Sequence, residues 1–361
     1  MHKINGKGVS TVLIIGIIIL IVAAVAIGYY FLTPPPEQPV TLTAGGASFP
    51  YPLMTKWTSE YNKLHPNIQI SYQSIGSGGG QNNLKSKTFD FACSDAYLTD
   101  AQIANYSGPV LHLPETAGGV VVSYNVPGVA SGLKLDADTI AKIFQANITK
   151  WNDPTITAMN PDFNLPNQDI VLVRRSDSSG TTFAFTGYLR TASTTWTLGQ
   201  GTTVNWPAGI GAPGNAGVAS TLLQTPYSIG YLEFWYAYNN SIPYATVKNH
   251  DGQFVVPSLE TIGNAARAGA PLLAKDMRAS IANLPGDNVY PISTFTYVLV
   301  YKDLSYMDQA KATAVVNFLW WAVHDGQNYS EALLYPKLPA EIVTLGEGIL
   351  HQITYQGMSL I

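Results

Sequence analysis

The chain has 361 residues, enough for two domains with substantial cores. Only 12% of the residues carry a charge, against roughly a quarter in an average protein, and the net charge is −4. A nucleic-acid-binding protein needs a basic surface, so this charge balance excludes that class. Apolar residues make up 46% of the chain, which indicates a folded globular protein rather than a disordered one.

The amino terminus predicts attachment to a membrane. Residues 9–32 form a run of 24 residues without a charge, long enough to cross a bilayer as a helix. Lys3 and Lys7 precede this run, so the rest of the chain is expected outside the cytoplasm, at the cell surface. The pair Lys7-Gly8 resembles the class III signals of archaeal pilin-like and surface binding proteins, which implies a leader over residues 1–8. An uncleaved anchor predicts almost the same topology.

Several smaller features agree with an exterior location. Residues 33–40, TPPPEQPV, predict a stiff, extended linker. The only cysteine, Cys93, excludes an internal disulfide and a lipid-modified amino-terminal cysteine, and we interpret it as a buried small side chain in a strand. Four glycosylation sequons begin at Asn105, Asn147, Asn239 and Asn328.

The remaining chain alternates strand-like and helix-like segments. The first set has strands at 40–45, 68–75 and 89–95, a helix at 51–65, and a second helix from the turn 76–80 to Leu84. Strand, helix and strand with glycines in the turns predict a mainly parallel sheet. The second set has segments at 118–126, 137–144, 169–176 and 228–238, a helix after Thr181, a strand region at 290–304 and an apolar helix at 307–326. We therefore expect two α/β lobes, with the carboxy-terminal third returning to the first.

Four short stretches are candidates for an anion site. Three of them, at 45–50, 74–80 and 174–182, place small or hydroxyl residues where a predicted helix begins, and the fourth, at 92–95, ends a strand in a carboxylate. A helix start offers free N–H groups and the positive end of the helix dipole, and Ser or Thr adds a hydroxyl donor. Each stretch alone also fits a helix cap or a turn.

Arg175, Asp177 and Asp95 suggest how such a site could select its anion. The guanidinium of Arg175 has the planar geometry that suits a tetrahedral oxyanion, and Asp177 could hold it in place. Asp95 could accept a hydrogen bond from the proton of hydrogen phosphate or dihydrogen phosphate. Fully ionised sulfate has no such proton and would leave the carboxylate unpaired. As a single residue, Asp95 also fits a turn at the end of a strand.

Successive motifs of the chain resemble those of the periplasmic phosphate-binding protein of the high-affinity phosphate ABC transporter. They include AGGASFPYPLMTKWTSEY, YQSIGSGGGQNNL, DFACSDAYL, VRRSDSSGTTFAFTGYL and PYSIGYLEFWYAY, in matching order from about Thr41 to residue 343. The resemblance implies a two-lobed periplasmic-binding-protein (type II) fold in which each lobe has a central mixed β-sheet flanked by helices. Lobe I is expected at 41–116 and 289–361, and lobe II at 117–288.

The resemblance also implies the function and the ligand residues. Phosphate would bind between the lobes and pass to an ABC permease, without catalysis, cofactor or metal. Carried over by motif, the phosphate-binding residues would be Ser48, Phe49, Ser77, Asp95, Arg175, Ser179, Gly180 and Thr181, with Asp177 orienting Arg175. Two positions depart from the family pattern: Ser178 replaces a glycine, and Ser48 stands where threonine is frequent. Both departures leave the ligand class intact, although the affinity could differ.

Three other functions compete with this interpretation. A hydrolase or phosphatase could use Ser179, but the chain has no G-x-S-x-G motif and no histidine in a motif that suggests a base. GIGAPG at 209–214, with Glu233 downstream, formally matches a dinucleotide motif but contains a proline. The pilin-like amino terminus is also compatible with a structural surface subunit.

Overall fold

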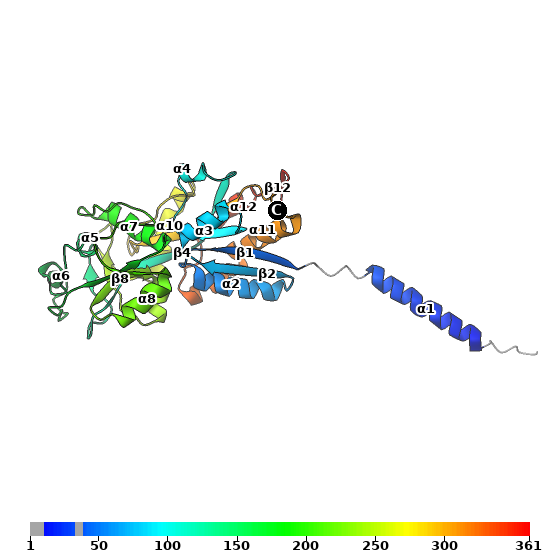
Figure 1. Cartoon of the computed structure of the whole chain (residues 1–361), viewed down its shortest axis with the longest axis horizontal. Helices are drawn as coiled ribbons and strands as arrows, with labels where there is room; N and C mark the ends of the chain where they lie inside the picture. Colours follow the sequence, from blue (N-terminus) through cyan, green and yellow to red (C-terminus); the bar gives the residue numbers. More distant parts are fainter. Residues whose placement is uncertain (1–10, 33–38) are drawn as a thin grey trace, which may run out of the picture. The chain divides into compact units, whose positions relative to one another are not determined.

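The computed structural model describes residues 11–32 and 39–361 of the chain. The chain divides into two compact units, with the boundary between Pro39 and Val40. The first unit contains helix α1 (Thr11–Leu32), and the second contains all other described elements (Figure 1). The expected leader, residues 1–8, and most of the expected linker lie outside the described residues.

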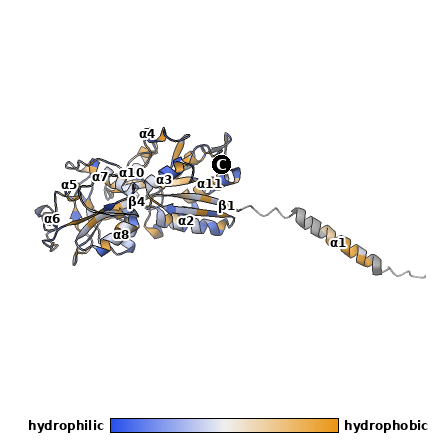
Figure 2. Ribbon diagram, viewed as in Figure 1, coloured by the Kyte–Doolittle hydropathy of each residue, from blue (hydrophilic) through white to orange (hydrophobic). Residues whose placement is uncertain are grey.

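Helix α1 coincides with most of the apolar run at the amino terminus. The hydrophobic side chains described in it, within residues 14–22, are exposed and appear in the hydrophobic colour of Figure 2. Among the residues that the structure describes, no helix has both the length and the apolar character needed to cross a membrane. The membrane-spanning helix predicted for residues 9–32 is therefore not confirmed.

Eight strands form one continuous mixed sheet in the second unit, in the order β2-β1-β3-β11-β4-β8-β6-β7. They are β1 (Val40–Gly46), β2 (Ile68–Ser74), β3 (Phe91–Ser94), β4 (Val110–Asn125), β6 (Val171–Arg175), β7 (Ile210–Ala212), β8 (Ser228–Glu233) and β11 (Ser293–Tyr301). A three-stranded sheet contains β5 (Lys134–Leu135), β9 (Thr246–Lys248) and β10 (Phe254–Val255), and β12 (Thr354–Tyr355) pairs with β13 (Met358–Ser359).

Strand β4 connects the two lobes. Its first part, from Val110 to Gly119, pairs antiparallel with β11, and its last part, from Val120 to Asn125, pairs antiparallel with β8. In the first lobe β1 is parallel to β2 and β3, and in the second β6 is parallel to β7 and β8. Figure 1 shows β4 between the part of the molecule that holds β1 and β2 and the part that holds β8.

The register brings the carboxyl ends of the parallel strands of both lobes to the middle of β4. Strand β3 ends at Ser94, next to Tyr297 of β11, which in turn pairs with Pro114 of β4. Strand β8 ends at Glu233, opposite Val120 of β4. Because β3 and β8 run in opposite directions, the segments that follow them converge from the two lobes. Ligands of open α/β sheets bind at such carboxyl ends.

Helices cover the sheet in both lobes. Those packed against the strands of the first lobe are α2 (Tyr51–Leu64), α3 (Ser77–Lys85), α10 (Leu259–Leu273), α11 (Gln309–Val323) and α12 (Ala340–Leu350). In the second lobe α7 (Gly180–Ala192), α8 (Gly214–Gln224) and α9 (Phe234–Asn239) pack against the strands, and α5 (Ala137–Phe144) packs against α7. Shorter helical segments are α4 (Asp100–Ile103), α6 (Pro154–Met159) and two 3₁₀ turns, Asp325–Tyr329 and Glu331–Leu333.

The apolar pattern of the sequence correctly predicts many of these elements. In α2, Leu53, Trp57 and Tyr61 lie at helical spacing and are buried, whereas Leu64 at the helix end is exposed. Burial of three large apolar side chains contributes roughly 1.5–3 kcal/mol each. Cys93 is a free, buried thiol in β3, as the sequence predicts.

Two segments differ from the prediction. Strand β4 begins at Val110, eight residues before the predicted segment 118–126. The prediction missed its first part because His112, Glu115 and the proline between them interrupt the apolar pattern of a strand that is buried on both faces. The segment 228–238 is two elements rather than one. Its strand ends at Glu233, whose Oε1 accepts a hydrogen bond from the Trp235 backbone N–H at 3.0 Å and caps helix α9.

Candidate functional site

The predicted anion residues come together, buried, where the two lobes meet, and we call this place the cleft. Ser48 and Phe49 follow β1, Ser77 is the first residue of α3, and Asp95 directly follows β3. From the other lobe, α7 begins at Gly180, next to Ser179 and Thr181. A Cβ atom built on Gly180 would lie 2.6 Å from Asp95 Oδ2 and in even closer contact with Ser77 Oγ. The helix start of one lobe therefore faces the helix start and strand end of the other.

Arg175 lies at the end of β6, buried and held in one orientation. Its Nε donates a hydrogen bond to Asp177 Oδ1 at 2.7 Å, its Nη2 is paired with Asp177 Oδ2, and its Nη1 donates to Thr181 Oγ1 at 3.0 Å. These bonds use three of the five N–H groups, which leaves two for a ligand. Asp177 also accepts from the Gly214 backbone N–H at 3.1 Å. The predicted orienting role of Asp177 fits this geometry.

The electrostatics of Asp177 agree with that role. Partial burial would raise the pKa of its carboxyl, but the hydrogen bond and the charge of Arg175 lower the pKa below its ordinary value. The carboxylate therefore stays ionised and keeps the guanidinium in place. Gly76 must pass close by, since a Cβ atom there would collide with the Asp177 carboxylate, and its φ of +81° also favours glycine.

Asp95 is the buried acceptor of the cleft. Burial raises the pKa of its carboxyl to about 7, although a hydrogen bond from Thr296 and the charge of Arg175 act in the opposite direction. Thr296 Oγ1 donates to Asp95 Oδ1 at 2.7 Å. The other oxygen, Oδ2, faces the start of α7. Thr296 lies on β11, and no motif in its own segment marks it as part of the site.

The hydroxyls of the cleft accept hydrogen bonds from backbone or amide groups. Ser179 Oγ caps α7 by accepting from the Thr182 backbone N–H at 3.0 Å, and its proton is still available for donation. Ser48 Oγ accepts from Asn215, a second residue that the sequence analysis did not identify. Its place in NWPAGIGAPGNAGVA, residues 205–219, a stretch that also resembles the family, is the signal that could have suggested it.

The loop between β6 and α7 tolerates Ser178 in place of the family's glycine. Its φ is not among the positive values found in the described residues, so this position does not need the freedom of glycine. Its carbonyl accepts a hydrogen bond from the Gly78 backbone N–H at 3.0 Å, and its hydroxyl contacts Thr202 Oγ1 at 2.9 Å. The lobes thus touch directly beside the cleft.

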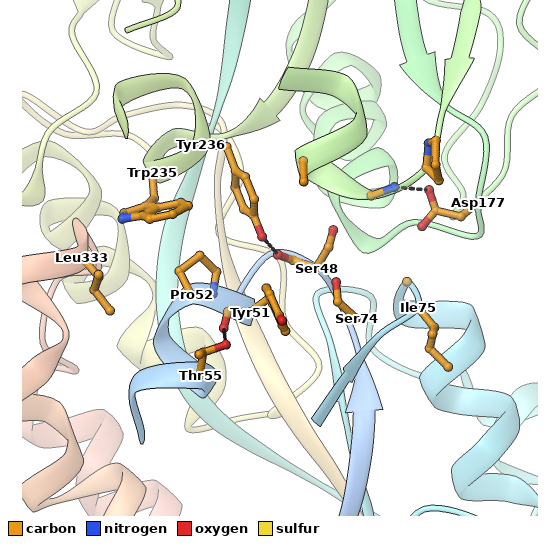
Figure 3. A pocket seen from close by; sticks show the side chains of 14 residues that line it. Ser48, Tyr51, Pro52, Thr55, Ser74, Ile75, Asp177, Trp235, Tyr236 and Leu333 are labelled. Atoms are coloured by element: carbon orange, nitrogen blue, oxygen red, sulfur yellow. Dashed lines mark hydrogen bonds between the residues drawn. The ribbon is translucent and has the colours of Figure 1, made fainter. Parts of the chain in front are cut away.

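A pocket of about 710 Å³ lies next to these residues (Figure 3). Only Ser48 and Asp177 of the predicted set line it, and most of its wall is apolar or aromatic. Its other lining residues include Tyr51, Trp235 and Leu333. An apolar wall has few hydrogen-bond donors for an oxyanion. We therefore assign the anion to the donors of the cleft rather than to this pocket.

The geometry does not favour a hydrolase, a dinucleotide site or a metal site. Ser179 serves as a helix cap, and in GIGAPG the short strand β7 lies inside the motif instead of before it. Across the described residues, no cluster of three or more His, Cys, Asp or Glu side chains could hold a metal ion. The site consists of N–H and hydroxyl donors around one guanidinium, with one buried carboxyl opposite.

Two α/β lobes that enclose a cleft of this kind define a solute-binding protein of the periplasmic-binding class. Comparison with known families agrees, because residues 33–325 match the PBP superfamily domain. Curated relatives narrow the assignment. The Phosphate-binding protein PstS of Pasteurella multocida is 41% identical over 85% of this chain and 88% of its own length. That of Methanocaldococcus jannaschii is 36% identical over 88% of each chain. The chain belongs to the PstS family of phosphate-binding proteins.

Solved structures show the same fold at lower identity. A high-affinity periplasmic phosphate-binding protein (PfluDING), solved with bound phosphate, has a TM-score of 0.68 at 20% identity and covers 87% of this chain and 99% of its own. A putative phosphate ABC transporter substrate-binding protein with bound phosphate, from Clostridium perfringens, has a TM-score of 0.59 at 17% identity, covering 83% and 100%. These likenesses establish the two-lobed α/β fold.

Proposed function

We propose that this protein binds inorganic phosphate in the cleft between its lobes and delivers it to an ABC permease for import. The observation that carries the proposal is the pairing of one buried guanidinium, Arg175, and several helix-start donors with a single buried carboxyl, Asp95. The names of the relatives with which the chain shares its family state phosphate binding. As a member of that family, the protein is a solute-binding protein rather than an enzyme.

The ligand shell follows from the converging segments. Backbone N–H groups and hydroxyls at three helix starts would donate to the phosphate oxygens, together with the free N–H groups of Arg175. The proposed ligands are Ser48, Phe49, Ser77, Arg175, Ser179, Gly180 and Thr181. Asp95 would accept the proton of the ligand, and Asp177 would keep Arg175 in position. Sulfate would be rejected because it leaves the Asp95 carboxylate unpaired in a buried place.

The lobes would be residues 41–116 with 289–361, and residues 117–288. The change of pairing partner on β4 after Gly119 supports a border near this place. Helix α10 falls in the second range, yet it packs against β11 and α12 of the first lobe. Hinge bending about the strand and loop connections would open the cleft, and phosphate would favour the closed form through contacts with both lobes. The permease would recognise that closed form.

We also propose that the amino-terminal segment tethers the protein to the outer face of the cytoplasmic membrane. The proposal rests on the sequence, namely the uncharged run 9–32 with Lys3 and Lys7 before it. The full chain should sediment with membranes and resist a salt wash, and a variant without residues 1–36 should be released. Recovery of the full chain in the soluble fraction would contradict the tether. The Asn residues of the four sequons are exposed, although Ser330 of the sequon at Asn328 is buried, and glycosylation remains a prediction.

Isothermal titration calorimetry on residues 37–361 tests the central proposal. Phosphate should bind at one site, and sulfate should compete poorly. Arg175→Ala should weaken phosphate binding by about a hundredfold or more, because it removes the only guanidinium proposed as a ligand and leaves Asp177 without its partner. Arg190→Ala, at the exposed far end of the same helix α7, is the matched control and should bind normally. Absence of phosphate binding by the unaltered protein would refute the function.

A further inference from the structure

Asn215 occupies a central position, although it was not among the ligand residues carried over by motif. It is the second residue of α8 and is completely buried. Its backbone N–H and its side-chain Nδ2 both donate to Ser48 Oγ, at 3.0 and 3.1 Å. The same Nδ2 donates to Thr181 Oγ1 at 3.2 Å. One amide therefore contacts a hydroxyl from each lobe.

A hydrogen bond from the backbone of Glu233 fixes the orientation of the Asn215 amide. The Glu233 backbone N–H donates to Asn215 Oδ1 at 3.1 Å, so the carbonyl end of the amide points away from the two hydroxyls. Glu233 ends β8, and its own side chain caps α9, which holds this backbone in place. A rotated amide would leave the Glu233 N–H facing another donor, and this penalty favours the observed orientation.

The bonds from Asn215 determine what the two hydroxyls can do. A hydroxyl oxygen has two lone pairs for accepting hydrogen bonds and one proton for donating. At Ser48 both lone pairs are occupied by Asn215, and at Thr181 they are occupied by Asn215 and by Arg175 Nη1. Each hydroxyl can then only donate. A hydroxyl restricted in this way suits an anion, which offers only acceptors, apart from its own protons.

We propose that Asn215 is a positioning residue that turns the Ser48 and Thr181 hydroxyls into obligate donors and joins them across the closed cleft. This inference rests on the proposed binding of phosphate, and in it Asn215 acts without touching the anion. It raises affinity because, in the closed form, the two hydroxyl protons can point only towards the anion. It also favours closure, since Ser48 and Thr181 belong to different lobes.

Two substitutions separate the roles of the amide. Asn215→Ala frees the hydroxyls to rotate and should weaken phosphate binding about tenfold, the effect of losing one or two hydrogen bonds. Asn215→Asp replaces the donor by an acceptor and adds a negative charge beside the anion, so the loss should be about a hundredfold or more. Asn160→Ala is the matched control, because Asn160 is a buried amide whose hydrogen bonds go to Lys134 and Ile156 instead of the cleft. It should lower stability and leave the phosphate Kd unchanged.

A double-mutant cycle distinguishes positioning from general stabilisation. In a chain that already carries Ser48→Ala and Thr181→Val, Asn215→Ala should have little further effect on the phosphate Kd, because the hydroxyls through which it acts are gone. If the tenfold loss persists in that background, or if Asn215→Ala binds as tightly as the unaltered chain, the inference is wrong. Should Asn215→Ala not fold, Asn215→Ser keeps a small polar group and allows the same comparison. Failure of the unaltered chain to bind phosphate would instead refute the proposed function.

Discussion

At the scale of single residues, Asp95 links anion selectivity to pH. Burial raises the pKa of its carboxyl to about 7. Above that pH the Asp95 carboxylate can accept a hydrogen bond from the proton of hydrogen phosphate. Below that pH the protonated carboxyl is itself a donor, and it no longer rejects sulfate. The preference for phosphate over sulfate should therefore fall as the pH drops through about 7, measured as competing affinities by calorimetry.

The variant Asp95→Asn serves as the control for this effect. Asp95→Asn has an amide that does not titrate, so its low selectivity should change little over the same pH range. Thr294 lies on the same strand as Thr296, and among the described residues its hydroxyl bonds only to the Phe295 carbonyl. Thr294→Val should therefore keep the pH dependence of the unaltered protein. A selectivity that is independent of pH in the unaltered protein would contradict the assignment of Asp95 as the discriminating acceptor.

A second buried carboxyl, Glu115, should shape the dependence of stability on pH. Burial raises its pKa to about 8, the charge of Asp95 acts in the same direction, and its Oε1 has no hydrogen-bond partner among the described residues. The native state therefore holds a proton that the unfolded chain releases near its ordinary pKa of 4.5. The resulting contribution to the free energy of unfolding is complete below that pH and is lost as the pH rises toward 8.

Glu115→Gln tests this contribution. The free energy of unfolding, measured by urea denaturation, should decline less steeply between about pH 5 and pH 8 in the variant than in the unaltered protein. Part of the slope should remain, because the pKa of Asp95 is also raised. Glu260→Gln, in the exposed first turn of α10, should leave the slope unchanged. Equal slopes for Glu115→Gln and the unaltered protein would show that Glu115 is ionised in the native state.

At the scale of elements, the start of α7 approaches the opposite lobe so closely that it requires glycine. A Cβ atom on Gly180 would come within 2.6 Å of Asp95 Oδ2. Gly180→Ala should hold the lobes apart and reduce phosphate affinity by about a hundredfold or more. The fold should survive, because the φ of Gly180 is not positive and alanine can adopt it.

Gly348→Ala provides the comparison for Gly180→Ala. Gly348 lies in α12, and a Cβ atom there would meet nothing within 4 Å. This variant should gain about 0.5–1 kcal/mol of helix stability in thermal unfolding and bind phosphate normally. If Gly180→Ala also bound normally, the observed proximity of α7 to Asp95 would have no part in ligand binding.

At the scale of the whole molecule, the described structure has its lobes in contact. The Gly78 backbone N–H donates to the Ser178 carbonyl across the cleft at 3.0 Å. If phosphate favours this closed form, hydrogen exchange of peptides spanning 76–85 and 176–185 should slow when phosphate is added. Peptides from the paired centre of β4 and β11 should exchange at the same rate with and without phosphate. Unchanged exchange at the cleft would argue against closure driven by the ligand.

The sequence by itself determined the family, most helices and strands, and the residues proposed to bind phosphate. These are local signals: apolar periodicity in α2, glycines and hydroxyls at helix starts, and Arg175 two residues before Asp177. It did not reveal the first part of β4, where a histidine, a proline and a glutamate interrupt the apolar pattern of a strand whose burial depends on partners on both sides.

Only the tertiary structure decided which distant residues complete the site. Thr296 reaches Asp95 across 201 positions of the chain, and Asn215 reaches Ser48 across 167. Such partners depend on strand order and register, in particular on β11 and β4, which lie between β3 and β8 and bring the carboxyl ends of these two strands to the same part of the sheet. A short motif contains no record of them. Every helix start offers free N–H donors, including the start of α7. This one becomes a wall of the anion cleft because the sheet places Ser77 and Asp95 opposite it.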